Sequence, residues 1–145
     1  MKKIFTLTVF AIITTLFLAS CVKESQYGIN ENYWLSKERG EVVYSDSYCN
    51  YFVVETINGY NIIRSNGGYK PFEQSIVYGN FSYQGTREFY NRSTGVVFTG
   101  TVTDYWLTYA EAQDALDYYC PLKNGAARTF SSADNGKGTL TFTPK

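Results

Sequence analysis

The chain has 145 residues, 44% of them hydrophobic and 18% charged, which is enough for one compact domain and too few for a large barrel enzyme. Its 13 basic and 13 acidic residues cancel, so bulk charge would not attract a nucleic acid. The chain contains no histidine, which excludes the usual general base, the usual zinc ligand and every catalytic triad built on histidine.

The first 20 residues have the pattern of a secretory signal peptide. Lys2 and Lys3 give a positive start, and a 15-residue apolar run, residues 4–18, follows. A membrane-spanning helix needs about 20 apolar residues. The run is therefore too short to stay as an anchor, and residues 1–20 are predicted to be removed.

The sequence Leu18-Ala19-Ser20-Cys21 ends this segment and resembles the lipobox of bacterial lipoproteins. The resemblance implies that Cys21 becomes the lipidated first residue of the mature chain. Two or three acyl chains anchor a protein stably, whereas one chain holds it only marginally. The alternative is an ordinary signal peptide in which Cys21 has no role.

Residues 21–33 are polar and are predicted to be a lipidated tether. Because no Asp follows Cys21, the lipoprotein resemblance implies the outer rather than the inner membrane. Lys23-Glu24 is a weak version of the signal for surface display in the Bacteroidota, so the periplasmic and the outer face both stay open. Residues 34–145 are predicted to form one mostly-β domain, similar in style to small uncharacterised Bacteroidota lipoproteins.

From Val42 onward, β-rich runs alternate with Gly and Asn. Residues 50–57 and 60–65 flank Asn58-Gly59, a strong signal for a hairpin with a two-residue turn in which both central residues have positive φ. Such a turn predicts three cross-strand pairs: Ile57 with Tyr60, Glu55 with Ile62, and Val54 with Ile63.

Three further strands are predicted, over residues 75–83, 86–91 and 96–107. In the last strand, apolar residues recur at every second position, which assigns the even positions to the core. Those positions are Val96, Phe98, Gly100, Val102, Asp104 and Trp106. Gly100 is predicted to be a point where this strand bends.

A capping box, Thr108 to Glu111, predicts a helix over residues 109–119. One face of it is apolar at helical spacing and is predicted to dock on the sheet. That face comprises Tyr109, Ala112, Leu116 and either Tyr119 or Cys120. Residues 127–131 and 139–143 are predicted to form a closing hairpin. The pattern predicts a small antiparallel barrel or sandwich of about seven strands with one helix in its C-terminal half.

Two cysteines remain in the mature chain besides Cys21, namely Cys49 and Cys120. Export delivers them to an oxidising compartment, where a disulfide is expected. The alternative is two separate buried thiols, because a free cysteine packs like a small apolar residue.

Aromatic residues make up 18% of the chain, including 14 tyrosines. Rings bury a large area each, so a small core built from rings is one interpretation. The other is a platform for a sugar or a peptide on the solvent face of the sheet. Strand alternation places three tyrosines out of phase with the core, and neighbouring strands would bring them onto one outer face: Tyr78, Tyr90 and Tyr105.

Asp104 falls on the predicted core face, where a carboxylate is costly unless it is paired. We expect it to bond a tyrosine hydroxyl, Arg87 or Arg92. A catalytic role would require a second carboxylate, and nothing in the sequence pairs Asp104 with Glu55 or Glu88. No enzyme is therefore predicted.

The remaining acidic residues predict no metal site. Residues 134–138 lack the alternating oxygen ligands of a calcium loop and are predicted to be a turn. Glu111, Asp114 and Asp117 form a stripe typical of a solvated helix face. Asp117 lies in the last turn, where the helix dipole disfavours an anion, so a basic neighbour such as Lys123 is expected.

The sequence therefore predicts a lipid-anchored outer-membrane lipoprotein that acts as a non-catalytic binding or accessory component of the envelope, with no cofactor and no metal. Its expected partners are the membrane, reached through the lipid anchor, and either another envelope protein or a glycan, with no nucleic acid. The alternative function is a glycan-binding module that uses the surface tyrosines.

Overall fold

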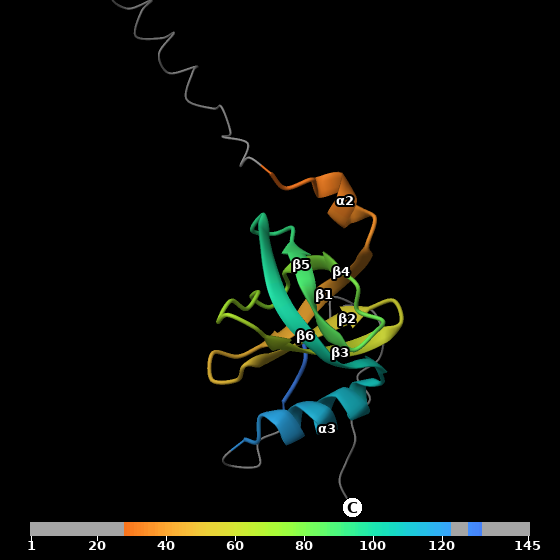
Figure 1. Ribbon diagram of the computed structural model, residues 1–145. Coiled ribbons are helices and arrows are strands. Elements are labelled where there is room, and N and C mark those ends of the chain that lie inside the picture. The colour runs from red at the N-terminus through yellow and green to blue at the C-terminus, as the bar shows by residue number, and fades with distance from the viewer. Residues whose placement is uncertain (1–27, 123–127, 132–145) are drawn as a thin grey trace, which may run out of the picture.

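The computed structural model describes residues 28–122 and 128–131 (Figure 1). Several predictions concern other parts of the chain. The signal peptide, the lipobox with Cys21, most of the tether, Lys123 and the segment 132–145 lie outside the described residues.

Two helices and six strands form within the described ranges. In chain order they are α2 (Glu31–Leu35), β1 (Glu38–Ser45), β2 (Tyr51–Thr56), β3 (Gly59–Ser65), β4 (Ile76–Gly79), β5 (Gly85–Asn91), β6 (Val96–Leu107) and α3 (Tyr109–Tyr119). The mostly-β class and the helix in the C-terminal half are confirmed, with six strands where about seven were predicted. The bounds of β6 and α3 are those that the sequence predicted.

The six strands form a closed barrel in the order β1-β2-β3-β6-β5-β4. Strands β1 to β3 are one antiparallel meander and strands β4 to β6 are another. The two meanders join where β3 pairs with β6 and where β4 pairs back with β1, both antiparallel. The architecture is therefore a barrel and not a sandwich.

Phenylalanine and valine fill the inside of the barrel. The interior cluster consists of Val42, Phe52, Val54, Ile63, Val77, Phe81, Phe89, Phe98 and Val102, with Tyr69 and Tyr105 packed against it. A barrel of few strands is only wide enough for its own side chains. The interior is accordingly a packed core, and a ligand would bind outside it.

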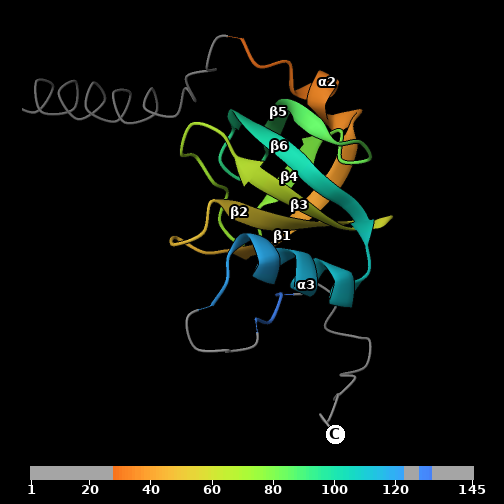
Figure 2. The same cartoon turned by 60° about the horizontal axis from the view of Figure 1, so that its bottom comes forward.

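Helix α3 packs on the outer face of β3 and its two neighbours, β6 and β2, and Figures 1 and 2 both show it on the outside of the barrel. This second cluster consists of Val43, Tyr44, Cys49, Val53, Ile62, Ala112, Leu116 and Phe130. Ala112 and Leu116 are fully buried, so the predicted apolar face of the helix is confirmed. Strands β2 and β3 are thus covered on both faces, which explains why successive residues are buried in each, 52–54 in β2 and 61–63 in β3.

Both ends of α3 are held by specific contacts. At the start, the predicted capping box is confirmed: the Thr108 hydroxyl accepts a bond from the Glu111 N–H, and the Glu111 carboxylate accepts one from the Thr108 N–H at 2.8 Å. At the other end, the predicted disulfide joins Cys49 to Cys120, with the two Cα atoms 5.8 Å apart. The helix is therefore fixed to the β1–β2 loop.

Arg128 is buried against the last turn of α3. Its guanidinium donates to the Asp117 carboxylate, to the Cys120 carbonyl and, at 3.0 Å, to the Tyr44 hydroxyl. The basic partner expected for Asp117 is thus Arg128. A cation at this position also complements the negative end of the helix dipole.

The predicted β2–β3 hairpin is present, but the predicted register differs from the observed one by two residues. Thr56 pairs with Gly59 and Glu55 with Tyr60, so Ile57 and Asn58 form the loop. Gly59 alone of the turn residues has a positive φ, 121°, and a Cβ there would lie 2.6 Å from the Leu107 carbonyl oxygen. Because the shift is even, each strand residue keeps its predicted face.

Strand β6 changes face near its end. The β3–β6 register skips Thr103, because Ile63 pairs with Val102 and Ile62 pairs with Asp104. An extra residue of this kind is a β-bulge, and it reverses the alternation of the residues that follow it. A second shift lies between Asp104 and Leu107, because Ile62 pairs with Asp104 and Tyr60 pairs with Leu107.

The two register shifts explain why the predicted core face of β6 is only partly correct. Phe98, Gly100 and Val102 are buried as predicted, whereas Trp106 is 54% exposed. Asp104 lies opposite Ile62, on the outer face covered by α3, and not in the barrel interior. Tyr105 packs against the interior cluster, so its predicted outer position is wrong.

The remaining differences lie in short segments. Helix α2 begins inside the predicted tether, and β1 begins four residues before Val42. The predicted strand 75–83 is shorter, because only Ile76–Gly79 pairs. Residues 128–131 form no strand, although the Ser131 N–H donates to the Val43 carbonyl at 2.8 Å.

Candidate ligand-binding cleft under α2

A cleft of about 510 Å³ lies between α2 and the β4–β5 side of the barrel. It is lined by Tyr33, Trp34, Ser36, Lys37, Glu38, Gly79, Asn80, Arg87 and Glu88. Small-molecule sites have volumes of about 300–1,000 Å³. In Figure 1, α2 stands beside β4 and β5, on the opposite side of the barrel from α3. The cleft is therefore well separated from the disulfide and its helix.

Helix α2, which forms one wall, is held in place by its side chains. With five residues it is too short to be stable by itself. Its cap, Asn30, accepts a bond from the Tyr33 N–H at 3.2 Å. The Trp34 ring stacks on Tyr90 with centroids 6.1 Å apart, and the Glu31 carboxylate pairs with Arg92 at 3.3 Å.

Two of the three predicted platform tyrosines support this wall from behind. Tyr78 and Tyr90 pair across β4 and β5 on the outer face, as predicted. They are only 7% and 6% exposed, and the Trp34 ring covers Tyr90. Tyr105 lies on the other side of the sheet, so the three rings do not form one exposed surface.

The Glu38 carboxylate fixes the loop between β4 and β5. One oxygen accepts a bond from the Phe81 N–H at 3.1 Å, and the other accepts one from the Ser82 hydroxyl at 2.8 Å. Arg87 holds the same loop by donating to the Gln84 carbonyl at 2.7 Å. The floor of the cleft is thus set by charge-assisted bonds, which are stronger than neutral ones.

The exposed side chains of the cleft carry charges of both signs. The Lys37 ammonium lies 4.5 Å from the centroid of the Tyr33 ring, on one wall. Glu88 lies on the other wall, and within the described ranges its carboxylate has no hydrogen-bonding partner. The Asn80 amide is also exposed. The cleft therefore offers donors and acceptors next to aromatic rings, without a dominant charge.

The other acidic residues singled out in the sequence lie away from this cleft. Asp104 lies next to Tyr119 of α3, where burial, with the carboxylate adding to it, raises the pKa of the tyrosine hydroxyl. Glu55 lies next to Tyr60, whose pKa is raised to about 12, mainly by burial and further by this carboxylate. Of the acids considered for catalysis, only Glu88 reaches the cleft.

Two other hollows lie around the β1–β2 loop, with volumes of about 780 and 570 Å³. Their basic groups already serve the fold. The Lys70 ammonium donates to the Asp46 and Cys49 carbonyls, and burial lowers its pKa. Arg128 is engaged with α3. These hollows therefore offer a ligand fewer free polar groups than the cleft under α2.

Sequence reasoning missed the aromatic wall because Tyr33 and Trp34 fall in or next to the predicted tether. A signal was present: Asn30 is a favoured helix N-cap residue, and Glu31 places an acid in the first turn. These two residues predict a short helix ahead of β1.

No protein-family model, no curated protein and no solved structure matches the chain. Neither of the two helices described here is long and apolar enough to cross a membrane. In residues 28–122 and 128–131, no three cysteine or carboxylate side chains are grouped closely enough to hold a metal ion.

Proposed function

We propose that this protein is a non-catalytic sugar-binding module carried on the outer membrane by a lipid anchor. The observation that supports binding is the cleft under α2, which combines an aromatic wall with free polar side chains in a volume suited to a small ligand. Glu38 supports a binding role over a catalytic one, since both of its oxygens are engaged by the protein itself.

The chemistry of the cleft favours a neutral sugar. Lys37 and Arg87 balance Glu38 and Glu88, so a strongly charged ligand would meet as much repulsion as attraction. A pyranose presents an apolar face of C–H groups and a rim of hydroxyls that both donate and accept. Aromatic rings match the face, and the amide of Asn80 and the two free charged groups match the rim.

Binding is tested by titration calorimetry against neutral homo-oligosaccharides of glucose, mannose, galactose, xylose and N-acetylglucosamine, one to six units long. We expect binding to at least one series. Tyr33→Ala and Glu88→Gln should each weaken that binding about tenfold or more, which corresponds to about 1.4 kcal/mol.

The matched control is Tyr118→Ala, because Tyr118 is an 82% exposed tyrosine on α3, away from the cleft. It should bind like the wild type. Absence of binding across the whole panel would overturn the proposed function, as would equal losses in the cleft variants and in the control.

The anchor is proposed from the resemblance of Leu18-Ala19-Ser20-Cys21 to a lipobox. Cells fed radiolabelled palmitate should label the wild-type protein and not the Cys21→Ser variant. The wild type should fractionate with the outer membrane. Labelling that persists after Cys21→Ser would remove the anchor from the proposal and leave the cleft unaffected.

A further inference from the structure

Trp106 has a backbone conformation that bulky residues rarely adopt. Its φ is 58°, in the left-handed region that favours glycine. Its N–H donates to Oδ1 of the fully buried Asn61 at 3.3 Å. Nδ2 of Asn61 donates in turn to the Val54 and Gly59 carbonyls, so the acceptor is fixed in place. Strain that is held by its surroundings in this way is concentrated at functional sites.

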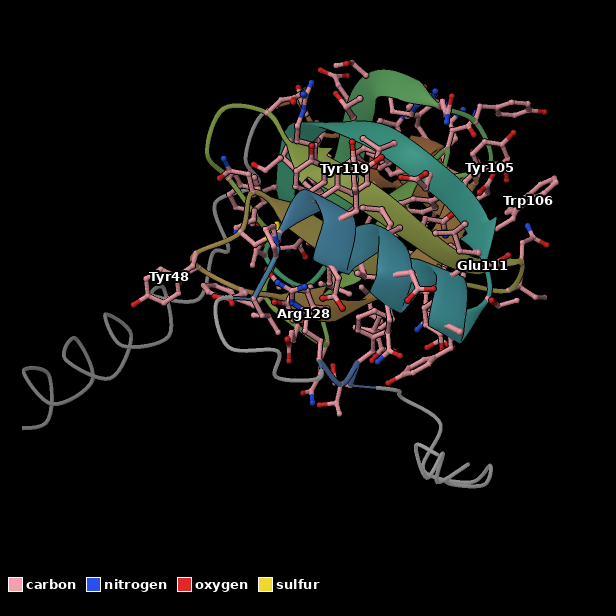
Figure 3. The ribbon with its side chains drawn as sticks, turned by 90° about the horizontal axis from the view of Figure 1, so that it is seen from below. Tyr48, Tyr105, Trp106, Glu111, Tyr119 and Arg128 are labelled. Carbon is pink, nitrogen blue, oxygen red and sulfur yellow. A yellow bond between two sulfur atoms is a disulfide. The ribbon has the colours of Figure 1, made fainter. Side chains whose placement is uncertain are left out.

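The Trp106 indole is exposed and yet fixed. It is 54% exposed, and Figure 3 shows it projecting from the rim of the barrel beyond the start of α3. Tyr105 contacts it edge to face, with centroids 5.5 Å apart. Its Nε1 donates to the Ser82 hydroxyl at 3.3 Å. With its one donor satisfied, the ring can offer a ligand its flat apolar face.

A short chain of hydrogen bonds links this ring to the cleft under α2. The Ser82 hydroxyl that accepts from Trp106 donates to the Glu38 carboxylate at 2.8 Å. Glu38 lines the cleft. The indole therefore lies two hydrogen bonds from the cleft, across the β4–β5 loop, and the same carboxylate fixes both the cleft floor and the loop.

We infer that Trp106 is a second aromatic subsite of the cleft and that the ligand is an oligosaccharide rather than a single sugar. One unit binds against the wall formed by Tyr33 and Trp34, and a further unit along the chain stacks on the indole. This inference rests on the proposed function. It gives a role to an aromatic side chain that lies at a strained, solvent-exposed position, where its ring adds little to the core.

The chain has two tryptophans, Trp34 and Trp106, one at each proposed subsite. Trp34→Phe and Trp106→Phe therefore give chains with a single fluorescent reporter each. We titrate both with the oligosaccharide panel, one to six units long. The Trp34 emission should respond to the monosaccharide and to the longer sugars. The Trp106 emission should respond only to the longer ones.

Affinity provides the second measurement. Trp106→Ala should weaken binding of the hexasaccharide about tenfold and leave the affinity for the monosaccharide unchanged. Trp106→Phe keeps a ring and should retain most of the hexasaccharide affinity, with Tyr118→Ala as the control. Thermal unfolding of each variant separates loss of the ring from loss of the fold.

The outcomes distinguish this inference from the proposed function. If Trp34 responds but Trp106 stays silent with every sugar, and affinity does not depend on length, the second subsite is wrong and the cleft stands. If neither reporter responds and calorimetry detects no binding, the proposed function fails, and the second subsite fails with it.

Discussion

Three glycines make room for neighbouring side chains inside the barrel. Gly40, Gly79 and Gly100 face inward, and a Cβ at each would lie 2.3 Å from Val54, 2.2 Å from Phe89 and 2.8 Å from Ile63, respectively. None of these three has a positive φ, so they are needed for space and not for backbone conformation. The sequence suggested a bend at Gly100; the structure adds a packing reason for the missing side chain.

Gly40→Ala tests this interpretation. The new methyl group must displace Cγ1 of Val54 or move the backbone, and overpacking of this kind costs about 1–3 kcal/mol. We expect the free energy of unfolding in urea to fall by that amount. In a Val54→Ala background the same substitution should cost much less, because the blocking atom is gone. An equal cost in both backgrounds would contradict the packing explanation.

At the scale of elements, α3 depends on its capping box. Thr108→Ala removes the acceptor for the Glu111 N–H and should cost about 1 kcal/mol of stability, measured by urea unfolding. A loss below about 0.3 kcal/mol would show that packing alone holds the start of the helix.

The capping box also makes the free energy of unfolding depend on pH. The hydrogen bond from the Thr108 N–H lowers the pKa of Glu111 below its ordinary value of 4.5. The stabilisation is therefore complete above pH 4.5 and is lost as the pH falls through the lower, folded-state pKa. Below pH 4.5 the unfolding free energy of the wild type should fall more steeply than that of Glu111→Gln, which keeps the acceptor but does not titrate. Parallel curves would contradict this assignment.

Local signals predicted most of the elements. The bounds of strand β6 and helix α3 agree with the prediction, because both follow from local patterns. These patterns are the alternation of apolar residues in β6 and the capping box at the start of α3. The bulge at Thr103 was not predictable, because it depends on how β3 pairs with β6. That shift placed Asp104 on the outer face and Tyr105 inward, and the second shift, between Asp104 and Leu107, includes the exposed Trp106. The predicted hairpin register was also wrong, because Ile57 and Asn58 form the loop where Asn58 and Gly59 were expected to.

Most of the candidate site could not be predicted from the sequence. Its wall comes from Tyr33 and Trp34, and its floor comes from Glu38 and Arg87, which only the closed barrel brings together. The tyrosines predicted to bind a ligand were placed on the correct outer face in two of three cases. Their burial could not be foreseen, because it requires α2 to fold back onto β5.

For the whole molecule, the disulfide is the strongest single constraint. It joins residues 71 positions apart, and a loop of that length is worth about 4 kcal/mol in the chain-entropy model. The double variant Cys49→Ser and Cys120→Ser should lose stability of that order and release the end of α3. Thiol counting in denaturant without reductant gives a direct check: a Cys21→Ser chain should show no free thiol, and two would contradict the bridge.

Closure of the barrel also limits how this protein can associate with other chains. Strand β1 pairs with β4 as well as with β2, so the barrel of described strands has no edge strand. Sheets with exposed edge strands can pair with a strand from a neighbouring chain and aggregate. The closed ring protects the described strands from that kind of self-association. A partner would therefore contact side chains and loops and not an unpaired strand edge, so substitutions at the surface can change what is bound without changing the hydrogen bonding of the barrel.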